Sequence, residues 1–206
     1  MDYVKFGIRL LLKTLYGQKA ANVEIPPVEN ITEYMECIQS RHPHLKNVWC
    51  TMDGLKLAIE AASSFEVQGR YFNGWIHGHF IGAIIVFCPD GTIPIVAYNC
   101  PGSVHDAQIA EWGDVYEKLE SVYGRCGGKC TVDSAFASSR YAFLIKSSQQ
   151  SNGGPQEYVV NAEATSMRQS AEWGMGLLQS SFPRIKEKLR FNDLGERKLI
   201  FRMYFY

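Results

Sequence analysis

Three carboxylates stand where this sequence could build a metal site. Asp53 and Asp133 each follow a short apolar run typical of a strand, and Glu172 borders the apolar stripe of a predicted helix. Two aspartates at neighbouring strand ends repel each other, and a divalent cation relieves that repulsion. Oxygen ligands in the order Asp, Asp, Glu favour Mg²⁺ or Mn²⁺. Two such ions can clamp the attacking and leaving oxygens during phosphodiester cleavage.

Each carboxylate also has an ordinary explanation. Asp53 precedes Gly54 and fits a simple turn, while Asp133 fits a turn or a helix cap. Glu172 fits a solvated helix face, where it would pair with Arg168 one turn earlier. Alone, each residue is better explained in these ways. The ordered combination is what favours a metal site.

A fourth carboxylate, Asp106, ends a Pro-Gly-Ser-Val-His-Asp segment over residues 101–106. Ser103 and Asp106 have the spacing of a capping box, which would explain both without catalysis. We weigh this explanation equally with a role for Asp106 beside the metal. His105 is a candidate contact to phosphate or to a metal ligand.

The segment 70–79 combines a basic residue, aromatic side chains and histidines. It predicts a strand-and-turn surface that contacts DNA through Arg70 and stacks on bases through Tyr71 or Trp75. For most of the aromatic residues, packing beneath a loop is the better explanation. A zinc hydrolase is the weakest alternative, and it would require three histidines to converge: His77, His79 and His105.

The elements that must position these residues follow an α/β order. Apolar periodicity and breaker residues predict the following, in chain order: helices over 3–16 and 31–41, strands over 48–52, 81–88 and 92–98, a helix over 104–122, strands over 129–132 and 142–146, a loop over 148–157, a helix over 164–189 kinked at Pro183, and a helix over 194–206. We expect a helical lead-in over 1–45, a catalytic domain over 46–190 and a truncated helix over 191–206.

The composition is that of a globular protein with one sizeable core. The chain has 206 residues, 46% of them hydrophobic and 20% charged. A formal net charge of zero is unusual for a nucleic-acid enzyme. From Arg168 onward, however, the sequence has eight basic and four acidic residues. This local basic excess makes Arg168 and Lys186 candidate phosphate contacts. The six cysteines lack a paired Cys-x-x-Cys pattern, and no apolar run predicts a membrane partner.

Five motifs in order resemble the PIF/Harbinger-like DDE superfamily endonucleases, a group of transposases and genes derived from them. The motifs are Met52-Asp53-Gly54, Arg70-Tyr71-Phe72-Asn73-Gly74 with His77, Pro101-Gly102-Ser103-Val104-His105-Asp106, Val132-Asp133-Ser134-Ala135-Phe136, and Arg168-Gln169-Ser170-Ala171-Glu172-Trp173-Gly174.

The resemblance implies an α/β, RNase H-like mixed sheet flanked by helices. It also implies DNA strand cleavage with two Mg²⁺ or Mn²⁺ ions and a nuclear location. Carried over residue by residue, Asp53 is the first catalytic carboxylate and Glu172 the last. Asp133 is the favoured middle carboxylate and Asp106 the competing one, and both are expected to line the site.

Transposases of this type usually need a separate DNA-binding module, which the segment 1–45 does not convincingly provide. A DNA-binding partner protein is therefore expected, and a homo-oligomer is left open. The sequence ends on an aromatic run within a predicted helix. Two hypotheses follow. The chain is an active endonuclease domain, or it is a truncated or domesticated, catalytically silent relic that serves as a binding module.

Overall fold

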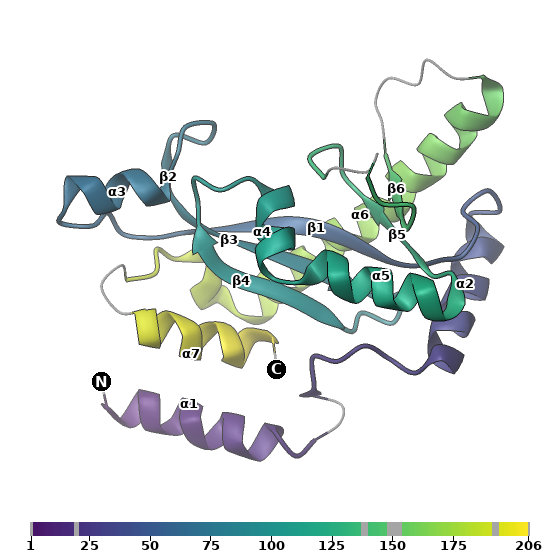
Figure 1. Ribbon diagram of the computed structural model, residues 1–206. Helices are drawn as coiled ribbons and strands as arrows, with labels where there is room; N and C mark the ends of the chain where they lie inside the picture. The colour runs from purple at the N-terminus through teal and green to yellow at the C-terminus, as the bar shows by residue number, and fades with distance from the viewer. Residues whose placement is uncertain (1, 19–20, 137–139, 148–153, 191–193, 206) are drawn as a thin grey trace.

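A six-stranded mixed sheet forms the centre of the protein (Figure 1). The computed structural model describes residues 2–18, 21–136, 140–147, 154–190 and 194–205. The strands are β1 (Val48–Ala58), β2 (Phe72–Asn73), β3 (Gly78–Phe87), β4 (Ile95–Pro101), β5 (Lys129–Val132) and β6 (Leu144–Lys146).

The sheet topology confirms the predicted RNase H-like α/β architecture. Five strands lie in the order β4–β3–β1–β5–β6, and β2 pairs with the start of β3. β3 runs antiparallel to both β1 and β4, whereas β1, β5 and β6 are parallel. The continuous run Ile81–Phe87 is buried along its whole length, as expected for a central strand covered on both faces.

Helices cover both faces of this sheet (Figure 1). On one face, Cys50 and Met52 of β1 share a core with α2 (Val28–Arg41), α4 (Asp106–Trp112) and α5 (Val115–Cys126). On the other face, Leu55 and Leu57 share a core with α6 (Pro155–Ser181), the 3₁₀ helix η2 (Pro183–Lys186) and α7 (Leu194–Phe205). The alternation of side chains along β1 therefore separates the two cores.

The remaining helices lie at the margins of the fold. α3 (Phe65–Tyr71) leads into β2, and α1 (Asp2–Leu15) packs against α7 (Figure 1). Among the described helices, none combines the length and hydropathy of a transmembrane span. The division of the chain at residues 45 and 190 stays a prediction, although α2 packs on β1.

Three elements differ substantially from their predicted bounds. β1 does not end at Asp53 but continues to Ala58, because Leu55 and Leu57 keep the alternation of buried positions. The helix predicted over 104–122 is two helices, α4 and α5. The break between them falls at Asp114, which takes a left-handed φ of 55°. Gly113 packs closely on β4, since a Cβ added there would lie 2.2 Å from Cβ of Ala97.

The long helix near the C-terminus is also displaced. α6 begins at Pro155, where a proline is tolerated in the first helical turn, and ends at Ser181. Pro183 begins η2 instead of kinking a continuous helix. Residues 155–157 of the predicted loop are therefore helical, and its residues 148–153 lie outside the described residues.

Candidate active site

Asp53 and Asp133 lie side by side because of the register between two parallel strands. Met52 of β1 is paired with Val132 of β5, so the next residue of each chain is one of the two aspartates. Residues paired in a parallel ladder direct their side chains to the same face. Asp53 shares the β1 alternation with Leu55, which places it on the face that α6 covers. The structure thus brings these two predicted residues together, although Asp53 is within a strand rather than at its end.

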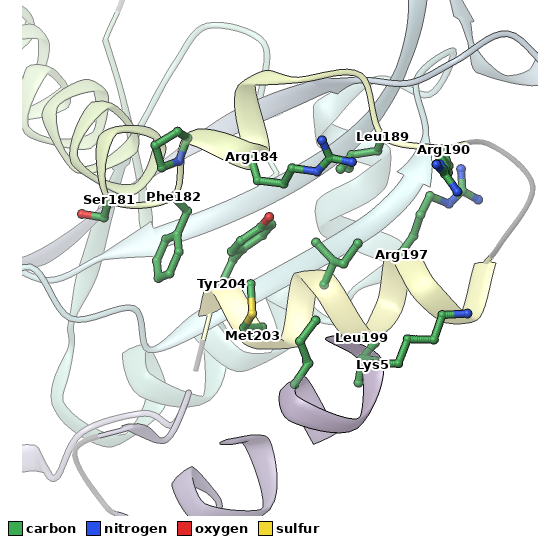
Figure 2. A pocket seen from close by; sticks show the side chains of 13 residues that line it. Lys5, Ser181, Phe182, Arg184, Leu189, Arg190, Arg197, Leu199, Met203 and Tyr204 are labelled. Atoms are coloured by element: carbon green, nitrogen blue, oxygen red, sulfur yellow. The ribbon is translucent and has the colours of Figure 1, made fainter. Parts of the chain in front are cut away.

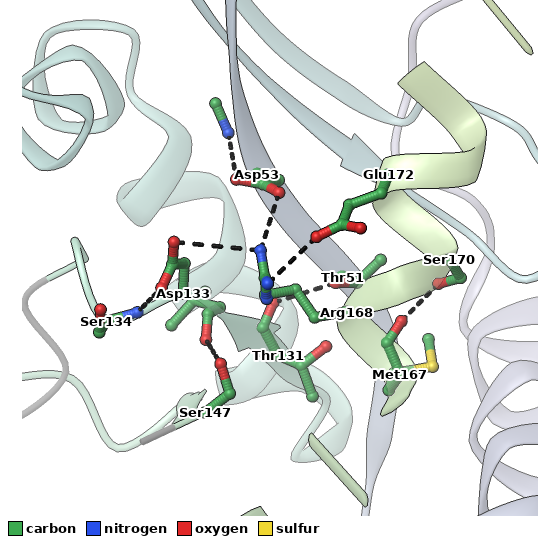
Figure 3. Close-up of polar contacts among 12 residues, drawn as sticks. Thr51, Asp53, Thr131, Asp133, Ser134, Ser147, Met167, Arg168, Ser170 and Glu172 are labelled. Atoms are coloured by element: carbon green, nitrogen blue, oxygen red, sulfur yellow. Dashed lines mark hydrogen bonds and ion pairs between the residues drawn. The ribbon is translucent and has the colours of Figure 1, made fainter. Parts of the chain in front are cut away.

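The guanidinium of Arg168 lies at the centre of three carboxylates (Figure 3). Its Nη1 is 3.4 Å from Oδ2 of Asp53 and 4.0 Å from Oδ2 of Asp133. Its Nη2 is 3.1 Å from Oε1 of Glu172, one turn further along α6. One cation from α6 therefore joins acidic groups from β1, from the end of β5 and from α6 itself. The predicted pair of Arg168 and Glu172 is present, but it is only one of the three contacts.

Asp106 approaches the same region from the opposite face of β1. A Cβ added to Gly54 would lie 2.5 Å from its Oδ2, so the absence of a side chain at residue 54 makes room for this carboxylate. Nζ of Lys56 is 4.0 Å from Oδ1 of Asp106. We did not predict the role of Lys56. Lys56 is two residues after Gly54 and therefore on the same face of the strand. This spacing is the feature of the sequence from which its position could have been predicted.

The capping-box interpretation of Ser103 and Asp106 is wrong. The hydroxyl of Ser103 donates a hydrogen bond of 2.6 Å to the carbonyl of Arg70 and not to a helix N–H. The residue at the N-cap of α4 is His105, and no side-chain hydrogen bond caps this helix. Asp106 is thus left with Lys56 as its ion-pair partner among the described residues.

Burial and repulsion between neighbouring carboxylates raise the pKa of two residues in this cluster. Burial raises the pKa of Asp53, and the negative charges of Asp133 and Asp106 raise it further. The backbone N–H of Gly54, which donates to Oδ1 at 2.7 Å, and the guanidinium of Arg168 lower this pKa but do not offset the increase. Burial likewise raises the pKa of Asp106, against the charges of Lys56 and His105. A further cation would relieve both groups.

The four side chains have oxygen ligands of the kind that a hard divalent cation prefers. In the described residues, however, these oxygens are not gathered closely enough to bind one. All four side chains offer carboxylate oxygens, which are the ligands that Mg²⁺ and Mn²⁺ prefer. In the described part of the chain, however, no three His, Cys, Asp or Glu side chains gather closely enough to hold a metal ion. The guanidinium of Arg168 takes the position of a cation among three of the carboxylates. The same absence of a ligand group removes support for zinc at His77, His79 and His105.

The four predicted DNA contacts occupy different places. Arg168 is in the carboxylate cluster, and the exposed His105 borders a cavity of about 610 Å³ beside Asp106. Arg70 is in α3 and not on a strand-and-turn surface, and its guanidinium lies 3.7 Å from Glu66. Lys186 is exposed in η2, beyond the end of α6, and in the described residues no ion pair joins it to the carboxylates.

A second cavity has a different character (Figure 2). It measures about 550 Å³, lies between α1, η2 and α7, and includes Phe182, Met203 and Tyr204 in its mainly apolar lining. None of the four carboxylates lines it. Its apolar lining would make it a default ligand site, although it is slightly smaller than the cavity beside Asp106, and the clustered titratable groups lie elsewhere.

A family model described as DDE superfamily endonuclease matches residues 52–202. The chain belongs to this family. The match spans Asp53, Asp106, Asp133 and Glu172 together with Arg168, so the cluster lies wholly within the endonuclease region. Membership of the DDE endonucleases supports a nuclease or transposase-like function and does not distinguish the PIF/Harbinger group. Neither the curated proteins nor the solved structures contain a match to the chain.

Proposed function

We propose that this DDE endonuclease domain cleaves phosphodiester bonds of DNA with Mg²⁺ or Mn²⁺, and that Asp53, Asp133 and Glu172 hold the metal. The observation that carries the proposal is the gathering of these three carboxylates around one guanidinium. A fourth carboxylate, Asp106, lies against the same strand. Such a concentration of like charge is costly without cations, and a metal-dependent nuclease needs it.

Each residue of the cluster has a distinct part in this proposal. Two bound divalent ions would supply stabilisation of the charge on the attacking and leaving oxygens. The backbone N–H of Gly54 holds the carboxylate of Asp53 in one orientation. With metal bound to the carboxylates, the guanidinium of Arg168 would contact a DNA phosphate, for which its planar fork is well suited. Further DNA contacts are proposed for three residues: Arg70, His105 and Lys186.

The biological setting is inferred from the motif resemblance. We place the chain among PIF/Harbinger-like proteins, in the nucleus, with a separate DNA-binding partner protein. A formal net charge of zero supports the need for such a partner, because non-specific DNA affinity comes mainly from basic residues. A homo-oligomer is compatible with this proposal and is not required by it.

Replacement of one central ligand tests the proposal. Asp53→Asn keeps the size of the side chain and removes its charge. It should lower Mg²⁺- or Mn²⁺-dependent nicking of supercoiled DNA by at least about 100-fold, since changes to residues that only support metal ligands already cost up to that much. Glu120→Gln, an exposed acid on α5, is the matched control. Nicking by Asp53→Asn at the wild-type rate would refute the proposed site.

A catalytically silent binding module is the second candidate. It is favoured by the fact that Arg168 already neutralises part of the cluster, and that no described group is assembled to hold an ion. This candidate predicts a folded wild-type protein that shows no heat of Mn²⁺ binding in calorimetry and no DNA nicking. Mn²⁺ binding that Asp53→Asn abolishes would exclude it.

A further inference from the structure

The turn between β2 and β3 presents an aromatic ring almost wholly to solvent. The side chain of Trp75 is 92% exposed, although an indole ring gains strongly from burial. Phe72, on the same short hairpin, is also exposed. Exposed aromatic side chains that cluster in this way mark interaction sites more often than a single exposed apolar residue does.

This turn is braced by the side chain of Asn73. Its Oδ1 accepts hydrogen bonds from the backbone N–H groups of Trp75 and Ile76, each at 3.1 Å. Its Nδ2 donates to the carbonyl of Gly102 at 2.8 Å, which fastens the turn to the segment before α4. The backbone that carries Trp75 is therefore held by hydrogen bonds before a ligand binds, which lowers the entropy cost of ordering the turn.

A cavity of about 610 Å³ separates this aromatic turn from the carboxylate cluster. Phe72 and Trp75 contribute to its lining, together with Lys56, His105 and Asp106. The volume is within the range of small-molecule sites. Asp106 belongs to both places, since it borders the cavity and also lies over Gly54, next to Asp53. A ligand in the cavity would thus lie beside Asp106, a carboxylate close enough to Asp53 to raise the pKa of that residue.

The chemistry of the lining favours a nucleobase. A flat aromatic ring offers a stacking surface to any base, and polar groups on the opposite side can meet the polar edge of that base. In an intact duplex both faces of a base are covered by its neighbours, so only an unpaired or extruded base can enter. The phosphate of the same strand would then extend toward Asp53.

We propose that the cavity between Trp75 and Asp106 binds one unpaired nucleobase of the DNA strand next to the bond that is cut, and that the base stacks on Trp75. This inference rests on the proposed function for the identity of the strand. It adds a base-binding subsite and a requirement for local strand opening.

Binding in EDTA tests the subsite without any cleavage. The probes are a fluorescent oligothymidylate and an oligomer of the same length made only of abasic deoxyribose phosphates, which has the same charge and no bases. Wild type should prefer the oligothymidylate. Trp75→Ala should weaken that binding by on the order of 10-fold, the cost expected for one lost base–aromatic stack, and should leave abasic binding unchanged. Trp75→Phe should retain most of the preference.

Trp112→Ala is the matched control, because Trp112 is 57% exposed at the end of α4 and does not line the cavity. Equal oligothymidylate affinity for wild type, Trp75→Ala and Trp112→Ala would overturn the subsite, as would an equal loss of abasic binding in Trp75→Ala. Metal-dependent nicking is measured separately. Nicking by wild type together with unchanged oligothymidylate binding by Trp75→Ala would refute the subsite alone. Absence of nicking together with a Trp75-dependent base preference would refute only the proposed function.

Discussion

Arg168→Met removes the one guanidinium that joins three carboxylates, and it should destabilise the metal-free protein. The substitution keeps an unbranched side chain of helix-forming type and deletes the charge. Asp53, Asp133 and Glu172 would then face one another without a cation among them. The backbone of α6 should be unaffected, because Arg168 makes its contacts through the guanidinium.

The size of the effect follows from the burial of Arg168. Exposed ion pairs contribute about 0–1 kcal/mol, whereas removal of one partner of a buried pair costs about 3–5 kcal/mol. The side chain of Arg168 is 23% exposed, and its partners range from 15% for Asp53 to 53% for Glu172. A loss of about 2 kcal/mol is therefore expected. For a chain of this size it corresponds to a decrease of roughly 4–8 °C in Tm.

The same substitution should strengthen metal binding. A unit positive charge about 4 Å from a divalent ion repels it by about 2 kcal/mol even in water. Removal of that charge should tighten Mn²⁺ binding by on the order of 10-fold. DNA nicking should nevertheless decrease, because the proposed phosphate contact is lost. Tighter metal binding with slower cleavage is a combination that general unfolding would not produce.

Thermal melts in EDTA and in MnCl₂, with calorimetry of Mn²⁺ binding, measure these effects. Arg184→Met is the control, because Arg184 pairs with Glu187 on the surface, where both side chains are 61% exposed. It should change Tm little and Mn²⁺ affinity not at all. If Arg168→Met melts like wild type in EDTA and binds Mn²⁺ with unchanged affinity, Arg168 does not neutralise the cluster and the electrostatic reasoning fails.

Two further predictions concern Gly54 and the hydrogen bond between Tyr34 and Asp90. Gly54→Ala places a Cβ 2.5 Å from Oδ2 of Asp106 and should lower nicking by about 100-fold through displacement of that carboxylate. Gly124→Ala, where the new Cβ would meet no other part of the fold within 4 Å, should leave nicking unchanged. Burial raises the pKa of Asp90, but hydrogen bonds, the largest from Tyr34 at 2.6 Å, outweigh it and lower this pKa. Tyr34→Phe should therefore cost about 1 kcal/mol of unfolding free energy at neutral pH. Chemical denaturation measures this difference in unfolding free energy between wild type and Tyr34→Phe. The difference should disappear as the pH falls from the ordinary aspartate pKa of about 3.9 through the lowered pKa of Asp90.

The sequence predicts the clustered carboxylates and the order of the main strands and helices, but it predicts neither α3 nor the division between α4 and α5. The apolar runs before Asp53 and Asp133 predict that both residues lie at strand ends. β1 in fact continues through Asp53, and the alternation of Leu55 and Leu57 was a local signal for that continuation. The error did not affect the pairing of the two aspartates, because the parallel register between β1 and β5 brings them together in either case.

Contacts between distant elements could not be predicted in the same way. Only the pair of Arg168 with Glu172 follows from helical spacing, while its contacts with Asp53 and Asp133 depend on how α6 packs over the sheet. The hydrogen bond from Ser103 to the carbonyl of Arg70 joins α3 to the segment before α4, so local spacing suggested a capping box in its place. The hydrogen bond from the side chain of Asn73 to the carbonyl of Gly102 also joins distant parts of the chain, so local sequence patterns do not predict it.

The electrostatics of the cluster bear on the choice between an endonuclease and a silent binding module. Arg168 supplies one positive charge to three carboxylates, and Lys56 pairs with the fourth. The pKa values of Asp53 and Asp106 are still raised, mainly by burial and further by neighbouring carboxylates. A binding module gains nothing from this burial of like charge, whereas a metal site needs it. Mn²⁺ should therefore raise the Tm of wild type and not that of Asp53→Asn, by mass action on the folded state. Equal melting of both proteins with and without Mn²⁺ would favour the binding module.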